Sequence, residues 1–75
     1  MKSNKFITYS VCYNPFKDIN TINQIKNNII PEIETQEGNM YLISEILDNL
    51  TLNIEAESIL YDLKHLNITI IEIPT

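Results

Sequence analysis

The chain has 75 residues, of which 44% are hydrophobic, and its formal net charge is −5. These values exclude a disordered chain and predict one small α+β domain over residues 1–75. The single cysteine, Cys12, excludes an internal disulfide, and no apolar run approaches the ~18 residues of a membrane span. Because no signal-peptide pattern is present either, we expect a cytoplasmic protein.

The charge is unevenly distributed along the chain. Residues 1–31 hold four lysines and one aspartate, a net charge of +3, whereas residues 32–75 hold nine acids and one lysine, a net charge of −8. An acidic half repels nucleic acid and attracts basic surfaces. No arginine is present, which excludes bidentate phosphate recognition by a guanidinium group.

The first part of the chain predicts a strand followed by a helix. Residues 5–13 (KFITYSVCY) alternate in polarity and are rich in β-formers. One face of this strand carries Ile7, Tyr9, Val11 and Tyr13. Residues 18–30 have isoleucines at helical spacing, with Asp18 as the predicted cap and Pro31 as the predicted end. Residues 32–38 are expected to form a polar, acidic connection.

The segment around Asp48-Asn49 allows two interpretations. As a hairpin turning at these two residues, 41–47 would pair with 50–56. One face of the hairpin then carries, with Glu45 as its single misfit, Tyr41, Ile43, Leu47, Leu50, Leu52 and Ile54. As a helix, residues 40–49 would also present an apolar stripe. The clean division into two faces favours the hairpin.

The last part of the chain predicts a helix followed by a strand. Residues 56–66 form the predicted helix, which Asn67 would end in the left-handed conformation. Its inward face carries Ile59, Leu60, Leu63 and Leu66. Residues 68–73 (ITIIEI) form the predicted last strand, which we expect at a sheet edge protected only by Glu72.

The predicted element order is βαββαβ. This is the ferredoxin-like arrangement, in which two helices cover one face of a four-stranded antiparallel sheet. The helical interpretation of residues 40–49 gives the order βααβαβ instead. In that case the chain resembles a shortened barstar, through the apolar spacing of GNMYLISEILDNL and AESILYDLKHLNITII.

No pattern in the sequence predicts catalysis, a cofactor or a metal site. Cys12 and His65 are the only classical nucleophile and base, and their spacing does not bring them together. We expect a buried cysteine and a histidine on the surface at a helix end. The acids Glu32, Glu34 and Glu37 lack the loop pattern of a calcium site and are expected to be solvated. We therefore predict that the protein is not an enzyme.

In size, acidity, composition and lack of catalytic residues, the chain resembles the small phage-encoded inhibitors of bacterial defence known as anti-CRISPR proteins. The resemblance implies a non-catalytic inhibitor that binds a basic, nucleic-acid-handling protein such as a CRISPR effector. It also implies action in the host cytoplasm, without direct binding to nucleic acid or membrane. The acids predicted to bind this partner are Glu45, Asp48, Glu55, Glu57 and Asp62.

A second hypothesis belongs to a different class. A small regulatory or ligand-binding domain could dimerise through its sheet, because an unprotected edge strand tends to pair with another strand. We expect the last strand, 68–73, or the open face of the sheet to form a homodimer contact or a heteromeric contact.

Overall fold

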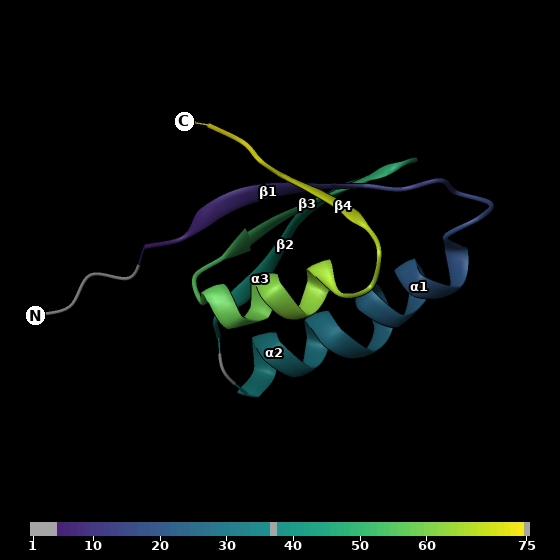
Figure 1. Ribbon diagram of the computed structural model, residues 1–75. Helices are drawn as coiled ribbons and strands as arrows, with labels where there is room; N and C mark the ends of the chain where they lie inside the picture. Colours follow the sequence, from purple (N-terminus) through teal and green to yellow (C-terminus); the bar gives the residue numbers. More distant parts are fainter. Residues whose placement is uncertain (1–4, 37, 75) are drawn as a thin grey trace, which may run out of the picture.

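The computed structural model describes residues 5–36 and 38–74. Four strands and two helical segments follow one another in the order βαββαβ (Figure 1). The strands are β1 (Ile7–Cys12), β2 (Met40–Ile46), β3 (Asn49–Ile54) and β4 (Thr69–Glu72). The first helical segment is continuous and comprises α1 (Ile19–Gln24), the π-helical η1 (Ile25–Ile29) and α2 (Ile30–Gln36). The second is α3 (Glu57–Lys64).

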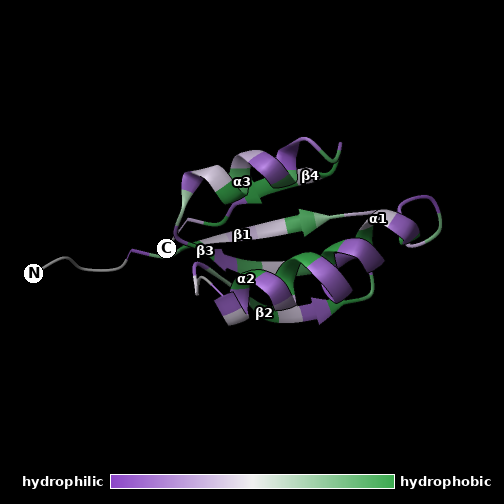
Figure 2. Cartoon of the chain, turned by 90° about the horizontal axis from the view of Figure 1, so that it is seen from below, coloured by the Kyte–Doolittle hydropathy of each residue, from purple (hydrophilic) through white to green (hydrophobic). Residues whose placement is uncertain are grey.

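The strands form one antiparallel sheet in the order β2-β3-β1-β4. Both helical segments lie on the same face of this sheet, with α2 on the side of β2 and α3 on the side of β4 (Figures 1 and 2). The α+β class, the antiparallel sheet and the single helical layer are therefore confirmed. The predicted edge position of the last strand is confirmed too, since β4 pairs only with β1.

The core lies between the sheet and the helices. Alternate residues of β1 and β3 point into it, as the period of two in a strand requires. The buried core side chains are Tyr9, Val11, Ile22, Ile25, Ile30, Met40, Leu50, Leu52, Ile54, Ile59, Leu63 and Ile68. Ile7 and Tyr13 pack against this cluster, so the predicted face that carries Ile7, Tyr9, Val11 and Tyr13 is the one that points inward.

The hairpin interpretation is confirmed, and the barstar-like alternative with a helix over 40–49 is wrong. The predicted turn, however, is displaced by one residue. Leu47 and Asp48 form the turn, and Ile46 pairs with Asn49, which therefore belongs to β3. The predicted pairing of 41–47 with 50–56 is consequently wrong in register.

A β-bulge completes the difference between the predicted and the observed hairpin. The register of β2 against β3 shifts between Leu42 and Ser44, so that Ile43 has no partner in the ladder. Beyond the bulge, Glu45 lies opposite the buried Leu50, on the helix side of the sheet. The apparent misfit thus lies on the helix side of the sheet, where its side chain remains 39% exposed, and Ile43 and Leu47 are exposed more fully. A one-residue shift reverses the face of every side chain beyond it.

The start of the first helix differs from the prediction. The Asn14 carboxamide oxygen accepts hydrogen bonds from the backbone N–H groups of Phe16 and Lys17, each at 2.8 Å. Asn14 therefore caps a first turn that begins with Pro15, a residue suited to that position. Asp18 caps no amide of the helix that follows, and its carboxylate accepts from the Asn14 N–H at 2.9 Å.

The first helix also continues past Pro31, where the sequence predicted its end. In a regular α-helix, a proline ring crowds the carbonyl four residues earlier. Here the wider π-helical turn precedes the proline, and the Ile30 N–H donates to the Ile25 carbonyl, five residues back. The wider turn accommodates the ring, as π-bulges do inside helices. The helix therefore reaches Gln36 and absorbs most of the expected acidic connection.

The second helix closely follows its prediction. Ile59 and Leu63 are buried, and Leu60 and Leu66 pack against the core. Asn67 adopts the left-handed conformation, with φ of 60°, and leads the chain into β4. Within residues 5–36 and 38–74, neither this helix nor the longer first one is long and apolar enough to cross a membrane.

Candidate functional site

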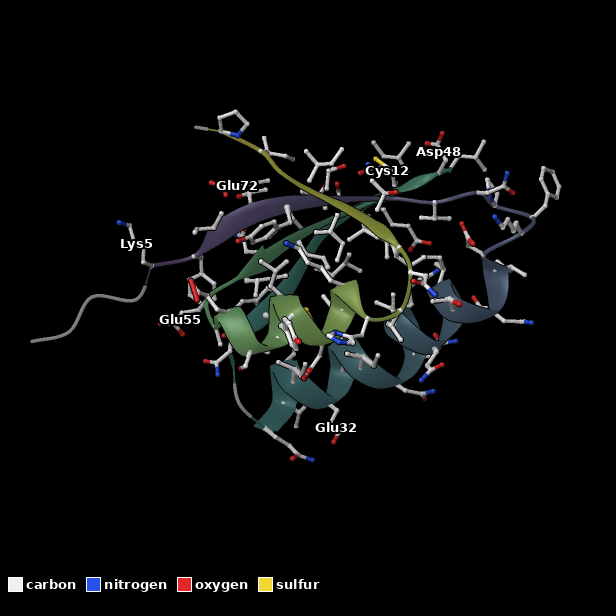
Figure 3. The ribbon with its side chains drawn as sticks, in the orientation of Figure 1. Lys5, Cys12, Glu32, Asp48, Glu55 and Glu72 are labelled. Carbon is white, nitrogen blue, oxygen red and sulfur yellow. The ribbon has the colours of Figure 1, made fainter. Side chains whose placement is uncertain are left out.

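The five acids predicted to bind a partner do not form one surface. Asp48 directly precedes β3 and Glu55 directly follows it. Six residues of strand separate them by roughly 20 Å, and Figure 3 shows the two labelled side chains at opposite ends of the sheet. Glu57 lies near Glu55, and Asp62 lies further along α3.

Glu45 is engaged inside the protein. Its carboxylate forms an ion pair with the Lys26 ammonium group of η1, across the gap between the helix and β2. The hydrogen bond from Lys26 to Glu45 raises the pKa of the lysine, against a smaller opposing effect of burial. This contact explains the inward position of Glu45 and leaves that carboxylate less available to a partner.

Asp48 and Asp62 occupy separate exposed positions. Asp48 lies in the β2–β3 turn, where its carbonyl oxygen accepts from the Tyr13 N–H at 3.1 Å. Asp62 borders an apolar groove of about 290 Å³ between α2 and α3, whose floor includes Ile33 and Leu63. Neither carboxylate has another predicted acid beside it.

Glu55 and Glu57 line a hollow of about 410 Å³ at the end of the sheet where α3 begins. We define the acidic hollow by its polar lining residues, Tyr9, Glu55, Glu57, Tyr61, Lys64 and Glu72. Ile7 and Leu60 supply part of its apolar wall. Glu72 reaches the hollow because β4 pairs antiparallel with β1, which sets Glu72 opposite Tyr9.

Tyr9 distinguishes the acidic hollow from an ordinary charged surface. The residue is 8% exposed, and no described residue forms a hydrogen bond with its hydroxyl group. Its oxygen therefore reaches solvent in the hollow, because every fully buried side-chain oxygen among the described residues has a hydrogen-bond partner. Burial raises the pKa of Tyr9, and the carboxylates of Glu72 and Glu57 raise it further. The hydroxyl group lies in the same hollow as these carboxylates, where it can donate or accept a hydrogen bond.

The structure separates the two residues considered for nucleophilic chemistry. Cys12 is exposed on the open face of the sheet, beside Ser10 and Asn49, so its expected burial is wrong. His65 is exposed at the end of α3, where its Nδ1 lies 2.9 Å from the Tyr61 carbonyl oxygen. The alternation along β1 that buries Tyr9 and Val11 turns Cys12 toward solvent.

The three acids expected in the polar connection 32–38 do not lie together in a loop. Glu32 and Glu34 lie on α2, and Glu37 lies outside the described residues. Across residues 5–36 and 38–74, no three His, Cys, Asp or Glu side chains are grouped so as to hold a metal ion.

Sequence reasoning missed the two residues that complete the acidic hollow. Tyr9 was placed on one face of the predicted first strand, and its hydroxyl group had no assigned role. Glu72 was considered only as the protection of an edge strand. The alternation of β1 and β4 was visible in the sequence, whereas their register was not, so the proximity of Tyr9 and Glu72 had no sequence signal.

We compared the chain with protein-family models, with curated proteins and with solved structures, and found no significant match in any of the three.

Proposed function

We propose that the protein is a non-catalytic binding protein whose acidic hollow receives a basic segment of a partner protein. The observation that carries this proposal is the Tyr9 hydroxyl group, which has no described partner and lies close enough to the Glu72 and Glu57 carboxylates for them to raise its pKa, in a hollow that Glu55 also lines. This hydroxyl group reaches the solvent of the hollow and can accept a hydrogen bond from an ammonium or guanidinium group that enters it.

The lining of the acidic hollow suits a lysine or arginine side chain. Its alkyl stem would pack on Ile7 and Leu60, and its charged head would meet the carboxylates. Glu55, Glu57 and Glu72 outnumber the one cation, Lys64, so the lining carries a net charge of −2. Glu57 and Glu72 are exposed and Glu55 is half-buried, so the attraction of the lining for a cation is screened by salt.

The class of partner that fits best is a protein that handles nucleic acid. Such proteins expose basic channels or segments for phosphate groups, and an acidic protein competes for them. Inhibition of a bacterial defence effector, as anti-CRISPR proteins perform it, is the specific form of this proposal. It is supported by the net charge of −5.

We also propose that the fold is a variant of the ferredoxin-like arrangement. The element order βαββαβ supports this assignment, as do the two interleaved crossovers. In the first crossover, the long helical segment joins β1 to β2, which lie on either side of β3. In the second, α3 joins β3 to β4, which lie on either side of β1.

The proposal is tested with a fluorescently labelled hexa-arginine peptide as the probe, titrated with the protein at several salt concentrations. The double variant Glu57→Lys/Glu72→Lys removes two carboxylates from the acidic hollow. The control, Glu32→Lys/Asp48→Lys, changes the net charge equally at exposed positions outside it (Figure 3). We expect the first variant to bind at least ~10-fold more weakly than the control, with affinity falling as salt rises.

Equal losses in the two double variants would show that the peptide senses only the net charge, and would contradict a specific site. The same pair of variants then serves in affinity capture from a bacterial host. A genuine partner is retained by the control and lost by the acidic-hollow variant.

A further inference from the structure

The two edge strands of the sheet, β2 and β4, differ in how their outward backbone groups are protected from pairing with another strand. At β2, the bulge at Ile43 interrupts the strand, and α2 lies alongside. The Glu34 carboxylate accepts the outward N–H of Leu42 at 3.2 Å. A bulge and a charged side chain on an edge both prevent another strand from pairing there. The β2 edge is therefore closed.

At β4, the outward backbone groups are free of such contacts. The Ile73 N–H donates inward to the Thr8 carbonyl oxygen at 2.8 Å, so the odd-numbered residues face β1. Because backbone groups alternate along a strand, the N–H and C=O of Ile70 and Glu72 point away from the sheet. No described residue forms a hydrogen bond with them.

We propose that β4 pairs antiparallel with β4 of a second copy of this chain, around a two-fold axis at Ile71. Ile70 of each copy then lies opposite Glu72 of the other, and the two residues exchange both backbone hydrogen bonds. Two four-stranded sheets join into one continuous sheet of eight strands. The surface assigned here is the backbone edge of β4; it shares Glu72 with the acidic hollow but does not depend on the proposed function.

Self-complementarity favours a second copy over the strand of another protein. The axis at Ile71 matches the outward groups of Ile70 with those of Glu72. It also sets Ile71, which is 53% exposed, against its own counterpart on the open face. An axis at Glu72 would oppose two carboxylates, which is unfavourable for directly facing residues. Pro74, which lacks an N–H, limits the pairing beyond the strand.

The net charge of the chain predicts how the dimer responds to salt. Each copy carries a net charge of −5, so the two copies repel one another at low salt. Added salt screens this repulsion and strengthens the dimer. Binding of a basic segment to the acidic hollow responds to salt in the opposite direction. The two interactions can therefore be separated in one protein.

Disulfide trapping tests the register directly. Residues that face each other in a non-hydrogen-bonded antiparallel pair have Cα atoms about 4.5 Å apart, a distance that a disulfide spans. We expect Ile71→Cys, made in a Cys12→Ser background, to form a covalent dimer under mild oxidation. Ile46→Cys in the same background is the matched control. It lies on β2 and is 64% exposed, but should remain monomeric.

Sedimentation measurements provide the second arm. Without cysteine substitutions, the protein should show a monomer–dimer equilibrium that shifts toward dimer as salt rises. Ile71→Lys should weaken it by about 10-fold, because it sets two like charges together, and Ile46→Lys should leave it unchanged. A monomer at all concentrations, or equal cross-linking from both cysteine positions, would overturn the proposal. Binding of β4 to a strand of another protein, without a dimer, would overturn it as well.

Discussion

The edge strands β2 and β4 occupy equivalent places in the sheet but are held in different ways. Each follows a helix, and each is entered through a residue in the left-handed conformation, Gly38 before β2 and Asn67 before β4. β2 has seven residues, a buried Met40 and an ion pair that fixes its far end. β4 has four residues, and none of them is fully buried.

This difference shows that one side of the molecule is held firmly, whereas the other leaves surfaces open for contact. The long first helix lies beside β2, and its Lys26 and Glu34 both bond to that strand. The short α3 has eight residues, and beside it lie the acidic hollow and the free edge of β4. Both proposed contacts with other molecules therefore lie on the less constrained side of the molecule.

The largest expected difference concerns side chains that anchor the two edges. Met40→Ala should lower the free energy of unfolding by about 2 to 5 kcal/mol, because Met40 is fully buried. Ile70→Ala on β4 should lower it by only about 1 kcal/mol, since Ile70 is half-buried. Urea denaturation at low protein concentration measures both values. Equal losses would show that β4 is anchored as firmly as β2.

The next difference concerns Gly38 and Asn67, the residues with positive φ that precede β2 and β4. Gly38 has φ of 68°, and an added Cβ would lie 3.2 Å from the Tyr41 hydroxyl oxygen. Gly38→Ala should therefore cost about 1 to 2 kcal/mol. Asn67→Ala should cost less, about 0.5 kcal/mol, because asparagine already carries a Cβ in this conformation.

Thermal unfolding of these two variants, with Asn67→Gly as a third, measures the effect. Asn67→Gly is expected to raise the melting temperature slightly, since glycine adopts a positive φ without steric cost. A lower melting temperature for this variant would show that the Asn67 side chain contributes a contact of its own.

A pH effect is expected beside β4 through Tyr9. Its pKa in the folded protein lies above the ordinary value of 10.0, with burial as the main cause and Glu72 and Glu57 as further causes. The stabilisation linked to the protonated hydroxyl group is therefore complete below pH 10 and is lost as pH rises through the folded-state pKa. Tyr9→Phe should flatten this alkaline loss, measured by urea denaturation from about pH 8 to about pH 11.

Lys26, beside β2, limits how much of the alkaline loss Tyr9→Phe can remove. Its pKa is also raised in the folded protein, so part of the loss above pH 10.5 should persist in the variant. An unchanged pH profile in Tyr9→Phe would contradict the assignment to Tyr9.

The smallest expected effect on stability concerns the Glu34 carboxylate, which protects the β2 edge. Glu34→Gln weakens the bond to the Leu42 N–H and should cost at most about 0.5 kcal/mol, because the contact is exposed. Glu32→Gln makes the same charge change on the same helix and should cost nothing measurable. A greater tendency of Glu34→Gln to self-associate, absent from Glu32→Gln, would confirm that this carboxylate protects the edge.

The sequence predicted best those features that depend on neighbours along the chain. The alternation in residues 5–13 identified β1 and its buried face, and the spacing in residues 56–66 identified α3. It predicted less well where distant parts meet. The attraction between Glu45 and Lys26 joins residues 19 positions apart, and no local pattern shows it. The acids of the site were visible, but not which of them gather.

The sequence by itself determined the α+β class, the order of elements and an excess of negative charge, because periodicity and composition are local properties. Only the tertiary structure decided the bulge at Ile43, the passage of the helix through Pro31 and the position of Glu72 opposite Tyr9. Each of these depends on how one element packs against another. The free energy of that packing belongs to the assembled sheet and helices and to no single segment of the chain.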